Sequence, residues 1–93
     1  MIEIFENGNG YKTIRKNGKL HHDEDLPAVV YEDKSEHYYK DGKLHRNNDL
    51  PAIVAANGFK AYYSDGKLHR DNGPAVIYPD GTKVFYKYGE LIG

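Results

Sequence analysis

Histidine is the residue type whose spacing most suggests chemistry in this chain of 93 residues. His21, His45 and His69 follow one another at steps of 24 residues, each directly after a Lys-Leu pair. If the chain repeats in space with this period, the three imidazoles should stack near one another, and three imidazoles can hold zinc. A role in holding a turn is favoured instead, because the acidic neighbours do not supply a constant fourth ligand. We therefore predict no metal site and no cofactor.

Two arginines follow the second and third of these histidines. Arg46 and Arg70 could bind phosphate, nucleic acid or a partner, and the alternative is an ion pair in the turn, such as Arg70 with Asp71 or Asp80. The formal net charge is −1, from 13 basic and 14 acidic residues. Binding to nucleic acid depends on an excess of positive charge. The ion pair is therefore favoured, and nucleic-acid binding is kept as the alternative function.

Catalytic side chains are few. Four carboxylates in predicted turns could pair as acid and base: Glu24, Asp25, Asp49 and Asp71. Acidic residues are common in turns for structural reasons. The chain has no Cys, which excludes disulfides, thiolate zinc sites and a cysteine nucleophile. Neither Ser35 nor Ser64 lies in a nucleophile elbow, so we predict that the protein is not an enzyme.

The histidines and arginines belong to a segment that the sequence repeats. We predict one domain over residues 1–93, with repeats at 17–40, 41–64 and 65–87 of 24, 24 and 23 residues. Partial copies at 9–16 and 88–93 are expected to cap the array.

Each repeat contains strand and turn signals. The segments PAVVY, PAIVA and PAVIY are rich in β-formers after a Pro. Asp41-Gly42, Asp65-Gly66, Asn57-Gly58 and the PDG at 79–81 are typical of two-residue hairpin turns. No apolar stripe has helical spacing. The pattern predicts an all-β fold, an antiparallel β-meander of three hairpin repeats.

Paired aromatic residues precede the DG turns. Alternation along an unbroken strand places Tyr38, Tyr62 and Phe85 on one face and Tyr39, Tyr63 and Tyr86 on the other. One stripe should be core and the other should face a partner; alternatively both are core, one covered by the N-terminal segment or a second copy. The candidate partner-binding residues are Tyr38, Tyr62, Phe85, Lys40, Lys60, Lys87, Arg46 and Arg70.

Residues 17–93 resemble a MORN-like repeat family with the core motif GKLHRxxGPA. The third repeat matches this motif from Gly66 to Ala75, whereas the second has Asp49-Leu50 at the Gly position. The first departs in the same way and has His22 in place of Arg. Such repeats are frequent in bacteriophage and large-virus proteins. The resemblance implies a phage-type accessory protein that binds and inhibits a host protein, such as a CRISPR or other defence effector.

The expected location is the cytoplasm, of the bacterial host if the chain is phage-encoded. No run of 18 apolar residues and no secretory signal pattern occurs, so no membrane contact is expected. The alternative to host-protein binding is a nucleic-acid binder or a structural protein that self-associates. A homodimer could form through open sheet edges.

Overall fold

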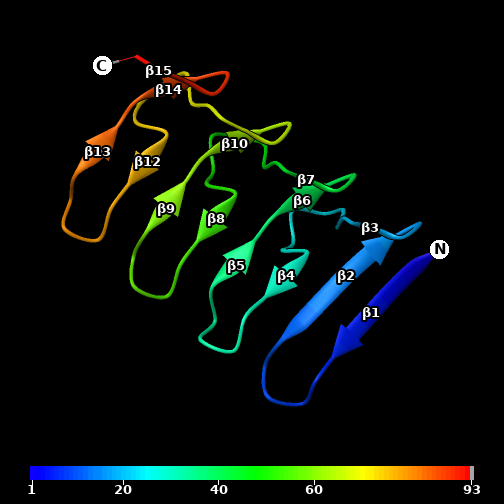
Figure 1. The fold of residues 1–93 in the computed structure, drawn as a ribbon. Helices are drawn as coiled ribbons and strands as arrows, with labels where there is room; N and C mark the ends of the chain where they lie inside the picture. The colour runs from blue at the N-terminus through cyan, green and yellow to red at the C-terminus, as the bar shows by residue number, and fades with distance from the viewer. Residues whose placement is uncertain (93) are drawn as a thin grey trace.

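The computed structural model describes residues 1–92, and in this range the chain forms only strands, turns and loops. Every strand pairing is antiparallel, and strands that follow one another in the chain mostly lie side by side (Figure 1). The predicted all-β meander is confirmed. The molecule measures 40 × 26 × 18 Å. Residues 1–92 include no helix that could cross a membrane.

One nine-stranded sheet runs the length of the molecule. Its order is β1 (Ile2–Glu6), β2 (Lys12–Lys16), β4 (Val29–Val30), β5 (Glu36–His37), β8 (Ile53–Val54), β9 (Lys60–Ala61), β12 (Val76–Ile77) and β13 (Lys83–Val84). The ninth strand, β3 (Lys19–Leu20), pairs with β2 alone. The strands β1 and β13 are thus the two edges of this main sheet, and β1 lies outside the predicted repeats.

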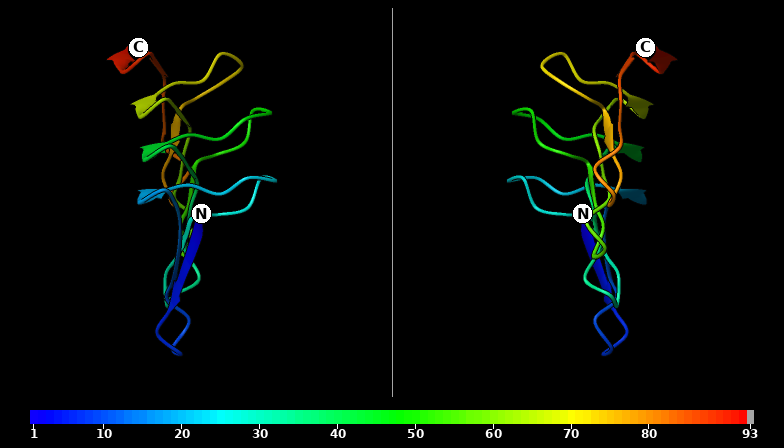
Figure 2. Two further views of the ribbon diagram at one scale, coloured as in Figure 1. Left: turned by 90° about the vertical axis from the view of Figure 1, so that its right-hand side faces the viewer. Right: turned by 90° about the vertical axis from the view of Figure 1, so that its left-hand side faces the viewer.

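Three short hairpins lie apart from the main sheet. They pair β6 (Tyr39–Lys40) with β7 (Lys43–Leu44), β10 (Tyr63–Ser64) with β11 (Lys67–Leu68), and β14 (Tyr86–Lys87) with β15 (Glu90–Leu91). Each of the three strands β4, β8 and β12 is preceded by a crossing loop, at residues 21–28, 45–52 and 69–75. Figure 2 shows the short hairpins and the crossing loops projecting to opposite sides of the main sheet.

The predicted unbroken strand through the paired tyrosines is wrong. The Tyr38 N–H donates to the Ala52 carbonyl of the main sheet at 2.7 Å, whereas the Tyr38 carbonyl accepts from the His45 N–H at 3.0 Å. The chain therefore leaves the main sheet at Tyr38 and enters the short hairpin at Tyr39. Side-chain alternation therefore cannot be carried through this break from the sequence alone; Tyr38 and Tyr62 are buried, whereas Tyr39 and Tyr63 are half-buried.

The DG turns adopt the predicted two-residue form. Asp41 and Gly42 have φ values of 50° and 84° between the paired residues Lys40 and Lys43, as a type I′ turn requires. The two-residue turns predicted at the PDG and at Asn57-Gly58 are wrong. At the PDG, the Tyr78 N–H donates to the Thr82 carbonyl at 2.8 Å, which leaves three residues in the loop. Asp80 is not among the residues with positive φ, whereas a type I′ turn needs positive φ at both central residues.

At Asn57-Gly58 the turn is likewise longer than predicted. The Ala55 N–H donates to the Phe59 carbonyl at 2.9 Å, so three residues separate the paired positions. Gly58 has a φ of 97°, and Asn57 is not among the residues with positive φ. A type I′ turn needs positive φ at both central residues, which explains why this Asn-Gly pair does not form one.

The core is thin and is built mainly from small side chains. Its buried apolar residues are Ile14, Ala28, Val29, Tyr38, Ala52, Ala61, Tyr62, Ala75 and Val76. Ala28, Ala52 and Ala75 end the three crossing loops and have no exposed surface. Small residues at these points allow the crossing loops to lie close against the main sheet.

Candidate functional site

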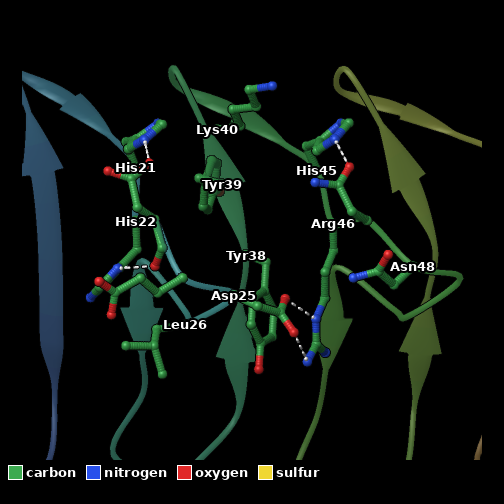
Figure 3. Close-up of a pocket in the computed structure, with 13 residues that line it drawn as sticks. His21, His22, Asp25, Leu26, Tyr38, Tyr39, Lys40, His45, Arg46 and Asn48 are labelled. Carbon is green, nitrogen blue, oxygen red and sulfur yellow. Dashed lines mark hydrogen bonds and ion pairs between the residues drawn. The ribbon is translucent and has the colours of Figure 1, made fainter.

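Two polar grooves separate the successive crossing loops. The first has a volume of about 250 Å³ and lies between residues 21–26 and 45–48, with Tyr38 and Tyr39 at its base (Figure 3). The second has a volume of about 200 Å³ and lies between the second and third crossing loops, above Tyr62 and Tyr63. The two grooves are the same feature at successive positions in the array.

An arginine links the first and second crossing loops across the first groove. The Arg46 Nε donates to Asp25 Oδ1 at 2.9 Å, and Nη2 donates to Asp25 Oδ2 at 3.3 Å. The Arg46 guanidinium carbon lies 3.7 Å from the centre of the Tyr38 ring, and Nη1 donates to the Pro51 carbonyl at 3.1 Å. Figure 3 shows this two-pronged contact in front of Tyr38. Arg46 therefore joins two loops and covers a core ring.

Arg70 repeats this arrangement between the second and third crossing loops. Its Nε donates to Asp49 Oδ1 at 2.8 Å, and Nη2 donates to Oδ2 at 3.3 Å. Its guanidinium carbon lies 3.9 Å from the centre of the Tyr62 ring, and Nη1 donates to the Pro74 carbonyl at 3.2 Å. The hydrogen bond from Arg70 holds the pKa of Asp49 below its usual value, and the same bond raises the pKa of Arg70.

The third crossing loop is one residue shorter and needs a glycine near Arg70. A Cβ atom added at Gly73 would lie 3.2 Å from Arg70 Nη1 and 3.3 Å from the guanidinium carbon. Glycine at this position lets the shorter loop pass next to the guanidinium group without displacing it.

The ion pair expected for Arg70 exists, but its partner is different. Asp71 lies 3.1 Å from the His69 ring, and Asp80 accepts a hydrogen bond from the Thr82 N–H at 2.9 Å. The partner is Asp49, which lies 21 residues before Arg70. The sequence contains the signal, because Asp25 and Asp49 both precede a Leu-Pro pair and both lie 21 residues before an arginine.

The histidines hold turns, as predicted, and the turn belongs to the next short hairpin along the array. Each Nδ1 accepts a backbone N–H: from Asp41 at His21 (3.0 Å), from Asp65 at His45 (3.1 Å) and from Tyr88 at His69 (3.0 Å). An accepting Nδ1 carries no proton, so the proton of the neutral ring lies on Nε2. That nitrogen faces Asp23 Oδ1 in His21 and Asn47 Oδ1 in His45, at 2.8 Å in both cases.

The predicted partner-binding residues lie in different environments. Tyr38 and Tyr62 are only 7% and 8% exposed, beneath the two arginines, which leaves little of either ring for a partner to contact. Phe85, at the matching position near the β13 edge, is 38% exposed. The three lysines, Lys40, Lys60 and Lys87, are exposed, two on short hairpins and Lys60 on the main sheet.

A second set of aromatic residues, not singled out from the sequence, lies partly exposed near the hairpin turns. We call Phe5, Tyr11, Tyr31, Phe59 and Tyr78 the aromatic row. Strand register places all five on one face of the main sheet, and Tyr38 and Tyr62, under the arginines, lie on the other. The Tyr11 and Tyr31 ring centres are 5.9 Å apart, and those of Phe59 and Tyr78 are 5.5 Å apart.

The aromatic row is only partly covered. Tyr31 is 38% exposed and Tyr78 is 44% exposed, while Tyr11 and Phe59 are half-buried. His37 lies beside Tyr31, with ring centres 4.9 Å apart, and its burial lowers its pKa. The crossing loops, which cover the opposite face through the two arginines, leave this row accessible.

The site offers contact surfaces. Across residues 1–92, no set of three or more His, Cys, Asp and Glu side chains is placed to hold a metal ion. Within the same range, every buried side-chain nitrogen and oxygen has a hydrogen-bond partner. The grooves thus present mainly polar groups already engaged between loops, and the aromatic row presents apolar rings that solvent reaches.

Comparison of the chain with protein-family models, with curated proteins and with solved structures finds no match. The resemblance to MORN-like repeats therefore stays a prediction that rests on the repeated motif.

Proposed function

We propose that this protein is a non-enzymatic protein-binding module and that its partner contacts the aromatic row. The observation that carries the proposal is the exposure of neighbouring rings on one open sheet face, Tyr31 and Tyr78 above all. Tyrosine buries a large ring at small entropic cost and is enriched at the centres of protein interfaces.

The nature of the partner is proposed from the resemblance to phage repeat proteins. In this proposal the chain is a phage-type accessory protein that binds and inhibits a bacterial host protein, such as a CRISPR or other defence effector, in the host cytoplasm. The aromatic row would supply the apolar centre of the contact. Exposed charged residues in the adjoining turns, among them Glu32, Lys34 and Asp80, would supply a polar rim.

Protein is favoured over nucleic acid because the two arginines best suited to phosphate are already engaged. In both Arg46 and Arg70, two guanidinium nitrogens donate hydrogen bonds to a carboxylate and the third donates to a backbone carbonyl. With a net charge of −1, the chain also lacks the basic excess that nucleic-acid binding requires.

The proposal is tested by affinity capture from bacterial lysate, including cells that express a CRISPR effector. The wild-type chain is compared with a variant carrying Tyr31→Ser and Tyr78→Ser. Tyr88→Ser is the matched control, because Tyr88 is an exposed tyrosine outside the aromatic row. We expect the wild type and the control to retain the same host protein and the double variant to lose it.

Thermal unfolding of all three proteins checks that the variants are folded. Equal capture by the double variant would show that the aromatic row is not the binding surface. Binding of the pure chain to single-stranded or duplex nucleic acid that weakens steeply with salt would instead support the nucleic-acid alternative.

A further inference from the structure

Within residues 1–92, both edges of the main sheet are open. All five residues of β1 are exposed. The Asn7 N–H donates to the Tyr11 carbonyl at 3.2 Å, so the alternating positions Glu6 and Ile4 direct their backbone groups away from β2. At the other edge the Ala75 N–H donates to the Val84 carbonyl at 2.9 Å, so Lys83 and Phe85 point away from β12.

A backbone donor at the β13 edge lacks the acceptor that its counterparts have. The Tyr38 and Tyr62 N–H groups donate to the Ala52 and Ala75 carbonyls of the next strand, both at 2.7 Å. Phe85 occupies the same position at the end of the main sheet. No backbone acceptor for its N–H lies within residues 1–92, and the edge is therefore a template for one more strand.

We propose that a second copy of this chain fills the position, by adding its β1 to β13. The main sheet passes through eight strands from β1 to β13, each antiparallel to the next, so β1 and β13 run in opposite directions. A second copy placed next to β13 by translation across the sheet has the same orientation as the first. Its β1 then meets β13 antiparallel, as the fold continues everywhere else.

The register of this contact follows from the rows of the sheet. One cross-strand row runs from Glu6 in β1, through Lys12 and Lys60, to Lys83 in β13. Continuing the row places Lys83 opposite Glu6 of the second copy. The neighbouring positions then pair Val84 with Phe5 and Phe85 with Ile4, and each pair lies on one face.

The paired side chains are complementary. Glu6 lies 3.7 Å from Lys12 in its own chain and is exposed, so it can also face Lys83. Ile4 is 60% exposed and Phe85 is 38% exposed in the unpaired chain, and pairing would remove apolar surface of both from water. The Phe85 N–H gains the Ile4 carbonyl of the second copy as its acceptor.

This contact joins unlike surfaces and leaves one β1 and one β13 edge open at the ends of every assembly. Such head-to-tail contacts build open chains rather than closed dimers unless the rotation between copies closes a ring. The contact is short, so assembly should be weak and should increase with protein concentration.

The test exchanges the two charges. Glu6→Lys and Lys83→Glu each place like charges opposite one another and should weaken self-association about 3- to 10-fold. In an equimolar mixture, every junction between unlike variants again pairs opposite charges, so alternating assemblies should form and much of the wild-type association should be recovered. Lys60→Glu is the matched control, because Lys60 is exposed in the same row but lies inside the sheet.

Sedimentation velocity of each protein over roughly 0.01–1 mM measures the association, and circular dichroism checks the fold. The proposal is supported if each single variant is weakened, the mixture recovers, and the control matches the wild type. It is overturned if the wild type stays monomeric, if the single variants associate normally, or if the mixture stays as weak as its components. These variants change no residue of the aromatic row, so failure of this proposal leaves the proposed function standing.

Discussion

Replacing Arg70 by Met should lower the free energy of unfolding by about 2 kcal/mol. The guanidinium stacks 3.9 Å above Tyr62, and loss of this contact removes about 0.5–2 kcal/mol. Loss of the hydrogen bond to the Pro74 carbonyl removes about 0.5–1.5 kcal/mol. The bond to Asp49 adds less than its geometry suggests, because the Asp49 side chain is 41% exposed and water screens it. Methionine keeps most of the aliphatic length.

Thermal unfolding followed by circular dichroism measures this loss. A change of 1 kcal/mol shifts the midpoint of a domain of this size by about 4–8 °C, so a fall of about 8–16 °C is expected. Arg15→Met is the matched control, because Arg15 carries the same charge on β2 and is exposed. If the Arg70→Met and Arg15→Met variants have the same midpoint temperature, the stacked arginine does not stabilise the array and the reasoning fails.

The stability lost in the Arg70→Met variant should depend on pH. Arg70 lowers the pKa of folded Asp49, whereas unfolded Asp titrates at about 3.9. The stabilisation is therefore present above about pH 4 and is lost as the pH falls through the lower folded pKa. The gap in stability between the wild type and the Arg70→Met variant should narrow below about pH 4, measured by urea unfolding at a series of pH values.

Three further predictions concern the core, the turns and the half-buried His37 ring. Ala52→Leu should destabilise the fold by about 1–3 kcal/mol, measured by urea unfolding, because Ala52 has no exposed surface; an unchanged midpoint would show that the crossing loop can move. His45→Ala removes the acceptor of the Asp65 N–H, worth about 1 kcal/mol, so exchange of that amide should accelerate about 5-fold in NMR measurements, and unchanged protection would exclude the bond. Burial lowers the pKa of His37, so the unfolded chain takes up the proton first and stability should fall as the pH drops below about 6.5; His37→Phe should reduce this dependence in thermal melts, and an equal slope would contradict it.

The turns could be predicted from the sequence because their conformations are decided locally. Asp41-Gly42 forms a type I′ turn since both residue types accept positive φ, whatever surrounds them. The PDG forms a longer loop because Asp80 does not adopt the positive φ that a type I′ turn needs. The strand β1 could also be predicted from the sequence, because Ile2, Ile4 and the intervening glutamate alternate as in a strand with one polar face.

The groove contacts could not be predicted from local pattern. Arg46 and Arg70 find their carboxylates in the preceding crossing loop, and only the three-dimensional stack brings those residues together. The departure of the chain from the main sheet at Tyr38 is equally non-local, because the His45 N–H competes for the Tyr38 carbonyl. Two aromatic residues in succession look alike in sequence whether or not the strand continues, so the sequence does not show that Tyr38 and Tyr62 are buried while Phe85 is exposed.

The placement of β1 and β15 at opposite ends of the array (Figure 1) governs how the fold would respond to force. Tension applied between these two strands acts along the direction in which the strands are stacked, which is also the direction of the hydrogen bonds of the main sheet. The bonds are then loaded one strand pair at a time, by peeling, rather than together in shear. The array should extend in small successive steps at low force, each step releasing one hairpin together with the arginine and histidine contacts that tie it to its neighbour.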